Sequence, residues 1–119
     1  MEKKEILALA KKTYKALSEK KAEDIRIIDI TSVTVVADYF IIASASNPLQ
    51  MNALQDAIDE VMTRNNISAK NVEGNKNSTW VLMDYEDIII HLFSKEDRIF
   101  YDLERIWQDG IPVKTEEWE

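Results

Sequence analysis

The stretch WVLMDYEDIIIHLF, residues 80–93, places chemically capable side chains inside a long apolar run. It holds two aspartates, Asp84 and Asp87, the chain's only histidine, His91, and a tryptophan, Trp80. Carboxylates and an imidazole can bind a metal ion or transfer protons, and an aromatic residue beside charges can bind a protein. The stretch is therefore a candidate metal site, catalytic site or docking face.

Residue types in the rest of the chain argue against the first two hypotheses. Zinc sites need several Cys or His ligands, and this chain has one histidine and no cysteine. Magnesium could bind Asp84 and Asp87 together with substrate phosphates, but the sequence has no glycine-rich phosphate-binding loop. No nucleophile-elbow sequence occurs that would serve His91. We expect no enzyme activity, no metal and no cofactor, and we keep a magnesium-dependent nucleotide-binding enzyme as an alternative.

Strand alternation divides the stretch into two faces. With Tyr85 and Glu86 at the tip of a tight hairpin, Asp84 lies opposite Asp87. One face is wholly apolar and is expected to point to the core: Val81, Met83, Ile88, Ile90 and Leu92. The other face mixes apolar and charged residues: Trp80, Leu82, Asp84, Asp87, Ile89, His91 and Phe93. This second composition predicts a protein-binding patch, because it is too apolar for a solvent face and too charged for an interior.

Each of these residues also has a purely structural interpretation. A histidine inside a strand is more often a structural residue than a ligand. Aspartates beside a turn commonly accept hydrogen bonds from backbone N–H groups. Trp80 could pack under a helix. The stretch alone does not decide between these interpretations and a docking face.

The net charge of −7 over 119 residues limits the classes of partner. A protein that binds nucleic acid directly needs a basic patch, whereas the lysines here are mixed with acidic residues. Little or no direct nucleic-acid binding is expected, and an acidic domain suits a basic protein partner. No apolar run approaches ~18 residues and no apolar signal core follows the N-terminus, so we expect a cytoplasmic location and no membrane association.

The remaining segments predict the elements that position residues 80–93. Apolar residues at helical spacing predict helices over about 3–18, 47–65 and 94–110, and Asn47 or Ser46 with Pro48 marks the second helix start. Strands are predicted at 24–30, at 33–45, near Val72 and as a pair within 80–93. The first helix should bury one stripe: Ile6, Leu7, Ala10, Tyr14 and Leu17.

This order of elements predicts one α/β domain, with a mixed β-sheet of about five strands covered by about three main helices. The domain is expected to span residues 1–110, and residues 111–119 are expected to form a mobile tail. The sequence does not determine the strand order.

Four ordered motifs extend over most of the chain: ADYFIIASASN at 37–47 with Gln50 following, VEG at 72–74, WVLMDYEDIIIHLF at 80–93 and RIFYDLERIW at 98–107. Together they resemble the Iojap-like ribosomal silencing factors, called RsfS in bacteria. The resemblance runs from the first helix through Trp107. It departs slightly at Ile106, where leucine is usual, and in the acidic tail.

The resemblance implies an α/β sandwich similar to nucleotidyltransferases but without their catalytic signature. It also implies a factor that binds the large ribosomal subunit through a basic ribosomal protein on the side that meets the small subunit. There it would obstruct subunit joining and lower translation when nutrients are scarce.

The resemblance also assigns roles to particular positions. The implied protein-binding residues are Trp80, Leu82, Asp84, Asp87 and His91, with Tyr85 as a neighbour and Ile89 on the same strand face. Four other matches are assigned mainly to folding: Asp38, Tyr39, Glu104 and Trp107. A homodimer formed through the same apolar face remains an alternative.

Overall fold

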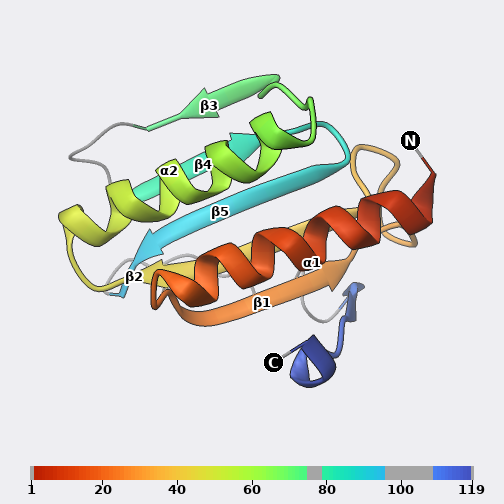
Figure 1. Ribbon diagram of the computed structural model, residues 1–119. Coiled ribbons are helices and arrows are strands. Elements are labelled where there is room, and N and C mark those ends of the chain that lie inside the picture. The colour runs from red at the N-terminus through yellow and green to blue at the C-terminus, as the bar shows by residue number, and fades with distance from the viewer. Residues whose placement is uncertain (1, 75–78, 96–108, 119) are drawn as a thin grey trace.

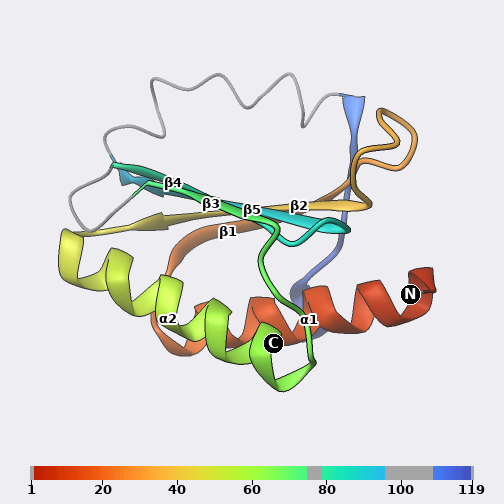
Figure 2. The ribbon, with the colours of Figure 1, turned by 90° about the horizontal axis from the view of Figure 1, so that it is seen from above.

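The computed structural model describes residues 2–74, 79–95 and 109–118, which form a mixed sheet with two helices on one side (Figure 1, Figure 2). The helices are α1 (Lys3–Glu19) and α2 (Pro48–Arg64). The strands are β1 (Glu23–Asp29), β2 (Tyr39–Ala45), β3 (Asn71–Glu73), β4 (Trp80–Asp84), β5 (Ile88–Ser94) and β6 (Ile111–Pro112). Their order is β3-β4-β5-β2-β1-β6, in which β2 and β5 are parallel and the other neighbours antiparallel. The predicted class, a mixed α/β domain, is confirmed, with six strands in place of about five.

The main core lies between the sheet and the two helices. Leu17 of α1 and Leu54 of α2 are fully buried against Ile41 and Ile90 of the central strands. The predicted α1 stripe is largely correct, but Leu7 is 36% exposed. The reason is helical geometry. The buried face of α1 is centred on Leu9, Thr13 and Leu17, and Leu7 lies to one side of that face.

The start of α2 is tied to the end of α1 by one side chain. Asn47 is the cap, and its Oδ1 accepts a hydrogen bond from the Gln50 N–H at 2.8 Å, as predicted from its residue type. The Gln50 Oε1 accepts from the Ser46 N–H at 2.6 Å. Its Nε2 donates to the carbonyls of Lys20 and Lys21 at 3.1 and 2.8 Å. Gln50 therefore fixes the relative position of the two helix termini.

The second predicted strand is shorter than expected. The apolar pattern predicted a strand over 33–45, whereas β2 begins at Tyr39. The preceding residues form a loop, in which the N–H groups of Val33 and Thr34 both donate to the carbonyl of Ile30. The valines of this loop favour a strand by type, but Val35 is fully exposed and pairs with no strand. A segment with strand propensity forms a strand only where a neighbouring strand can pair with it, and none of the described strands pairs with these residues.

The hairpin between β4 and β5 turns one residue later than predicted. Asp84 pairs with Ile89 rather than lying opposite Asp87, and Glu86 and Asp87 occupy the tip. Two observations explain why the turn lies one residue later. The Asp84 Oδ1 accepts a hydrogen bond from the Glu86 N–H, and Tyr85 is buried in the core at 4% exposure. Moving the tip by one residue changes each cross-strand partner by two positions, so the predicted division of side chains between the two faces survives.

The last described segment belongs to the sheet and the core. The domain was expected to end at residue 110, yet β6 pairs with β1 and the Val113 N–H donates to the Ile27 carbonyl. Trp118 packs edge-on against Tyr14, with ring centroids 5.6 Å apart. The helix expected over 94–110, with Glu104 and Trp107, lies largely outside the described residues. Within the described residues, no helix combines the length and apolar character needed to cross a membrane.

Candidate protein-docking site

An aromatic cluster holds Trp80 in place at the start of β4. Trp80 pairs with Phe93 across the β4–β5 ladder, and their rings stack with centroids 5.6 Å apart. The Trp80 Nε1–H donates a hydrogen bond to the Nδ1 of His91 at 3.3 Å. Phe40 of β2 lies edge-on to the His91 ring at 5.1 Å. The indole is thereby fixed by a strand pair, a stack and a hydrogen bond, while 38% of the residue stays exposed.

His91 is a buried, neutral member of this cluster. It is 7% exposed, and burial lowers its pKa from 6.5 to about 4. Its Nδ1 accepts from Trp80, so the proton of the neutral ring is on Nε2. No described residue accepts a hydrogen bond from that nitrogen. This supports the structural interpretation of His91, whose contact with a partner would act through Trp80.

The predicted binding residues separate into exposed and buried groups. Leu82 and Asp84 are half-buried and share the sheet face of Trp80. Ile89 and His91 lie on the same face but are buried, at 8% and 7% exposure. Phe93, also on this face, is fully buried, so the expectation that the whole face is accessible is wrong for these three residues. The cause is close packing of β5 between β4 and β2, where central-strand side chains are covered on both sides.

Tyr85 lies on the opposite side of the sheet from Trp80. It belongs to the core that the helices cover, and its hydroxyl has no hydrogen-bond partner among the described residues. Burial, followed by the charge of Asp59, raises its pKa to about 12. Tyr85 is thus a core residue in this structure, because its ring gains more from burial than from exposure at the hairpin tip.

The two aspartates stabilise the hairpin. The Asp84 carboxylate accepts from the Glu86 N–H at 2.8 Å, which is the turn-capping role considered for it. The Asp87 carbonyl accepts from the N–H groups of Asp38 and Tyr39, at 2.8 and 3.2 Å, and connects the tip to β2. The two aspartates are not cross-strand partners, so the direct opposition expected between Asp84 and Asp87 is wrong.

Strand β3 adds residues that the sequence did not indicate. Its Glu73 pairs with Leu82 and its Asn71 with Asp84, so these side chains lie on the Trp80 side of the sheet. The Asn71 Nδ2 donates to the Glu73 Oε1 at 3.1 Å. We define the edge patch as Glu73, Trp80, Leu82 and Asp84. The sequence marks Glu73 only as part of the VEG motif, and a prediction of the β3–β4 pairing would have been needed to place it beside Leu82.

Gly74 allows β3 to lie against the start of β4. Its φ is +104°, and an added Cβ would be 2.9 Å from the Trp80 carbonyl oxygen and 3.1 Å from the Val81 side chain. A side chain at this position would displace the backbone of Trp80. The glycine of the VEG motif is therefore part of what positions the edge patch.

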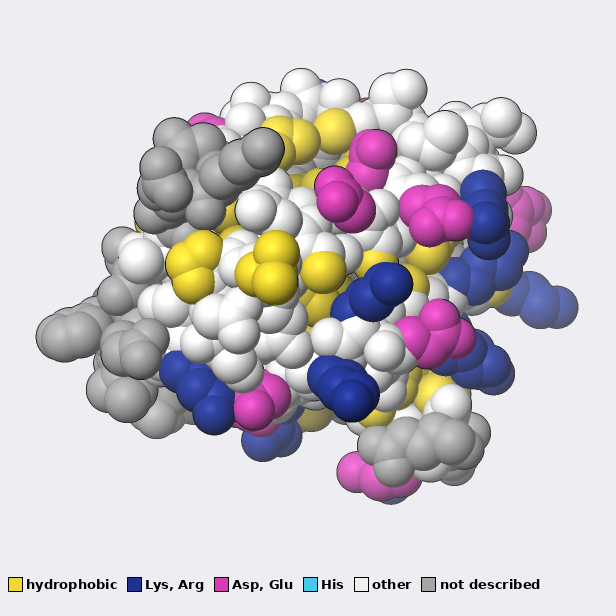
Figure 3. All heavy atoms as spheres, turned by 60° about the vertical axis from the view of Figure 1, so that its left-hand side comes forward, with side chains coloured by type: hydrophobic (Ala, Val, Ile, Leu, Met, Phe, Trp, Pro, Cys, Tyr) yellow, Lys and Arg dark blue, Asp and Glu magenta, His cyan; other side chains and the backbone are white. Residues whose placement is uncertain are grey.

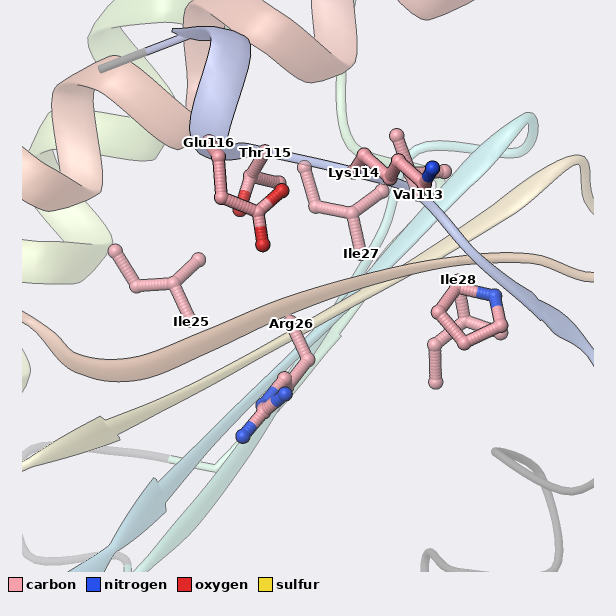
Figure 4. Close-up of a pocket in the computed structure, with 9 residues that line it drawn as sticks. Ile25, Arg26, Ile27, Ile28, Val113, Lys114, Thr115 and Glu116 are labelled. Atoms are coloured by element: carbon pink, nitrogen blue, oxygen red, sulfur yellow. The ribbon is translucent and has the colours of Figure 1, made fainter.

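The other end of the sheet carries a cavity that none of the predicted residues line. It measures about 230 Å³ and lies between β1 and residues 112–116 (Figure 4). Figure 4 shows Ile25 and Ile27 pointing toward the helices and Arg26 pointing to the other side of the strand. The Arg26 Nε already donates to Asp24 at 2.9 Å. Across residues 2–74, 79–95 and 109–118, no three His, Asp or Glu side chains are grouped so that they could hold a metal ion.

Comparison with known proteins identifies relatives over nearly the whole chain. The model of a family described as "Ribosomal silencing factor during starvation" matches residues 3–119. A Bacillus subtilis protein named Ribosomal silencing factor RsfS is 37% identical over 110 residues, which cover 92% of this chain and 91% of that protein. A protein of the same name from Halalkalibacterium halodurans is 32% identical and covers 98% of this chain and 97% of its own. A crystal structure of a Chromobacterium violaceum protein superposes with a TM-score of 0.82 at 26% identity, covering 95% of this chain and 92% of the other.

Proposed function

This chain belongs to the RsfS family of ribosomal silencing factors, and from that membership we propose that it binds the large ribosomal subunit through a basic ribosomal protein. Bound on the side that meets the small subunit, in the cytoplasm, it prevents subunit joining by steric obstruction. The result is repression of translation under nutrient limitation. Obstruction needs a rigid body at a contact surface and no catalytic group, so the proposal includes no enzyme activity.

The exposed and immobilised Trp80 is the observation that carries the proposal. Trp is among the residues that contribute most to protein–protein affinity, and truncating such a residue typically costs 2 kcal/mol or more. Here the ring is held by Phe93 and His91 before any partner arrives. Little side-chain entropy is then lost on binding, which favours affinity.

The charge around Trp80 indicates the chemistry of the partner. Glu73 and Asp84 lie on β3 and β4 beside it, and the chain as a whole has a net charge of −7. Lys or Arg side chains on a partner can pair with these carboxylates at the rim while an apolar surface covers Trp80 and Leu82. The opposite net charges would also speed the encounter at low ionic strength.

Replacing Trp80 tests the docking surface. Trp80→Ala should weaken binding to purified large subunits at least tenfold, measured by co-sedimentation across a concentration series. The matched control is Val35→Ala, because Val35 is an exposed apolar residue in the loop at the other end of β2. The control should bind as the wild type does. Circular dichroism must show that both variants are folded, and a folded Trp80→Ala variant that sediments at wild-type levels would refute the proposal.

Two further measurements separate the alternative functions. A homodimer formed through the same patch would appear in light scattering as a mass that rises with concentration and falls in the Trp80→Ala variant. A nucleotide-binding enzyme would produce heat in calorimetry with a nucleoside triphosphate and magnesium. The proposed function predicts no heat in the second experiment.

A further inference from the structure

The segment that contains the first helix is basic, although the chain as a whole is acidic. Residues 2–22 contain seven lysines and three glutamates, an excess of four positive charges. The rest of the chain has eight basic and nineteen acidic residues, an excess of eleven negative charges. The net charge of the chain is negative, and little nucleic-acid binding is expected from it. Residues 2–22 nevertheless carry a net positive charge.

Three lysines of α1 form one row along its outer side. Lys4, Lys11 and Lys15 are separated by seven and four residues, which places them on one line of the helix, and all three are exposed. Since the rise is about 1.5 Å per residue, the row extends over about 16 Å. None of the three forms an ion pair with any residue that the structure describes. We call these three residues the basic row.

Two other lysines of α1 have side-chain partners. The Lys3 Nζ lies 3.0 Å from the Asp29 carboxylate, and the Lys12 Nζ donates to the Asn65 Oδ1 at 3.1 Å. Glu5 and Glu19 are also on α1, to one side of the row by helical position. Asn65 is neutral and leaves the charge of Lys12 in place, and Lys20 and Lys21, just beyond the helix, form no ion pair with a described residue. The basic row is the part of this unpaired charge that lies along one line of α1.

The basic row and the edge patch lie on different sides of the molecule. Both helices cover one face of the sheet (Figure 2), and the Trp80 side chain lies on the other face. The front of Figure 1, where α1 lies, is turned to the right in Figure 3, and most Lys and Arg side chains in that view lie along its right-hand and lower parts. Either surface could therefore be lost without disturbing the other.

We propose that the basic row is a contact site for the phosphate backbone of RNA. A line of unpaired cations matches a polyanion, because each neutralised phosphate releases counterions and adds affinity. Reading of bases would need stacking or hydrogen-bonding groups, whereas the one aromatic residue of α1, Tyr14, is buried. The contact is thus independent of RNA sequence, weak by itself and sensitive to salt.

A pair of charge-matched variants tests the site. The row variant is Lys4→Gln/Lys11→Gln/Lys15→Gln. The control variant is Lys20→Gln/Lys70→Gln/Lys114→Gln, whose lysines are also exposed but lie outside the row. Both variants lose the same net charge. Binding is measured by fluorescence anisotropy with a labelled 20-nucleotide oligouridine between 25 and 200 mM salt.

The row variant should bind at least tenfold more weakly at the lowest salt, with the control variant within twofold of the wild type. The slope of log affinity against log salt is negative, and it should become shallower by about 2 in the row variant. The reason is that each lost contact to a single strand removes about 0.7 from its magnitude. Trp80→Ala should bind the oligouridine as the wild type does, so failure of the docking proposal would not be confused with failure of this one.

Three results would overturn the proposal. The wild type could show no binding at 25 mM salt. The two variants could lose affinity equally, which would mean that net charge alone is responsible. A labelled polyglutamate of equal charge could bind the wild type as tightly as the oligouridine, which would assign the row to an acidic protein.

Discussion

The Trp80 indole donates its N–H to the Nδ1 of His91 at 3.3 Å, and this bond joins the exposed end of the edge patch to a buried imidazole. The bond exists only while His91 is neutral, because a protonated Nδ1 cannot accept. The protonation state of His91 therefore determines whether this hydrogen bond helps to hold Trp80, the residue proposed to contact the ribosome.

Stability should fall in mild acid because of His91. The pKa of His91 is about 4 in the folded protein and about 6.5 when unfolded, so between these values the unfolded chain binds the proton more readily. The contribution of neutral His91 is complete above pH 6.5 and decreases as the pH falls toward 4. The full shift corresponds to on the order of 3 kcal/mol. His91→Gln retains an acceptor without titrating, so urea unfolding at pH 7.5, 6 and 5 should show its pH dependence reduced relative to the wild type. Parallel pH dependences would contradict this assignment.

Association with the large subunit should depend on Glu73 and on salt. Removing its charge in Glu73→Gln should slow association severalfold at low ionic strength, because an acidic rim attracts a basic partner. The difference should disappear at 1 M salt, where the Debye length is about 3 Å. Stopped-flow measurement with Glu116→Gln, which removes an exposed charge near the opposite sheet edge, provides the control. Equal rates at low and high salt would argue against the rim charges.

Gln50 should matter more for stability than its partial exposure suggests. Gln50→Glu keeps an acceptor for the Ser46 N–H but removes the two donors to the carbonyls of Lys20 and Lys21. We expect the free energy of unfolding to fall by about 2 kcal/mol. The substitution leaves the two backbone carbonyls facing a carboxylate, which cannot donate a hydrogen bond to them. Gln55→Glu, at another half-buried position of α2, should cost far less. Thermal and urea unfolding of the two variants would settle the comparison.

Residues after Gly110 should contribute to folding. Ending the chain there removes the β6 pairing and the contact of Trp118 with Tyr14. Burial of an aromatic ring and loss of strand hydrogen bonds together suggest a cost of about 3 kcal/mol. Trp118→Ala should show part of that loss. A truncated chain with the wild-type urea midpoint would mean that the tail is dispensable, as the sequence suggested.

Much of the fold could be predicted because the signals are local. The start of α2 follows from the chemistry of Asn47 and Pro48, and its end from Asn65 and Asn66, of which Asn66 has a φ of +61°. The two faces of β4 and β5 follow from alternation, which is unaffected by a change of register of two positions. Family membership was likewise visible from the ordered motifs, and the family match confirms it.

Errors occurred where a distant part of the chain decides the outcome. The valines of residues 33–36 have strand propensity, but they pair with none of the strands that the structure describes. Tyr85 could have been at an exposed tip, but the helix-covered core accepts its ring. Ile89 and His91 share a face with Trp80, yet their place in a central strand buries them.

The sequence by itself determined which side chains share a face, where the helices begin and which family the chain resembles, because each depends on residues close together in the chain or on ordered motifs. Only the tertiary structure decided that Trp80 stays accessible while His91 supports it from within, that Glu73 lies beside it, and that the tail completes the sheet. The physical reason is that accessibility and strand pairing are properties of packing between distant segments. Local residue types do not encode them.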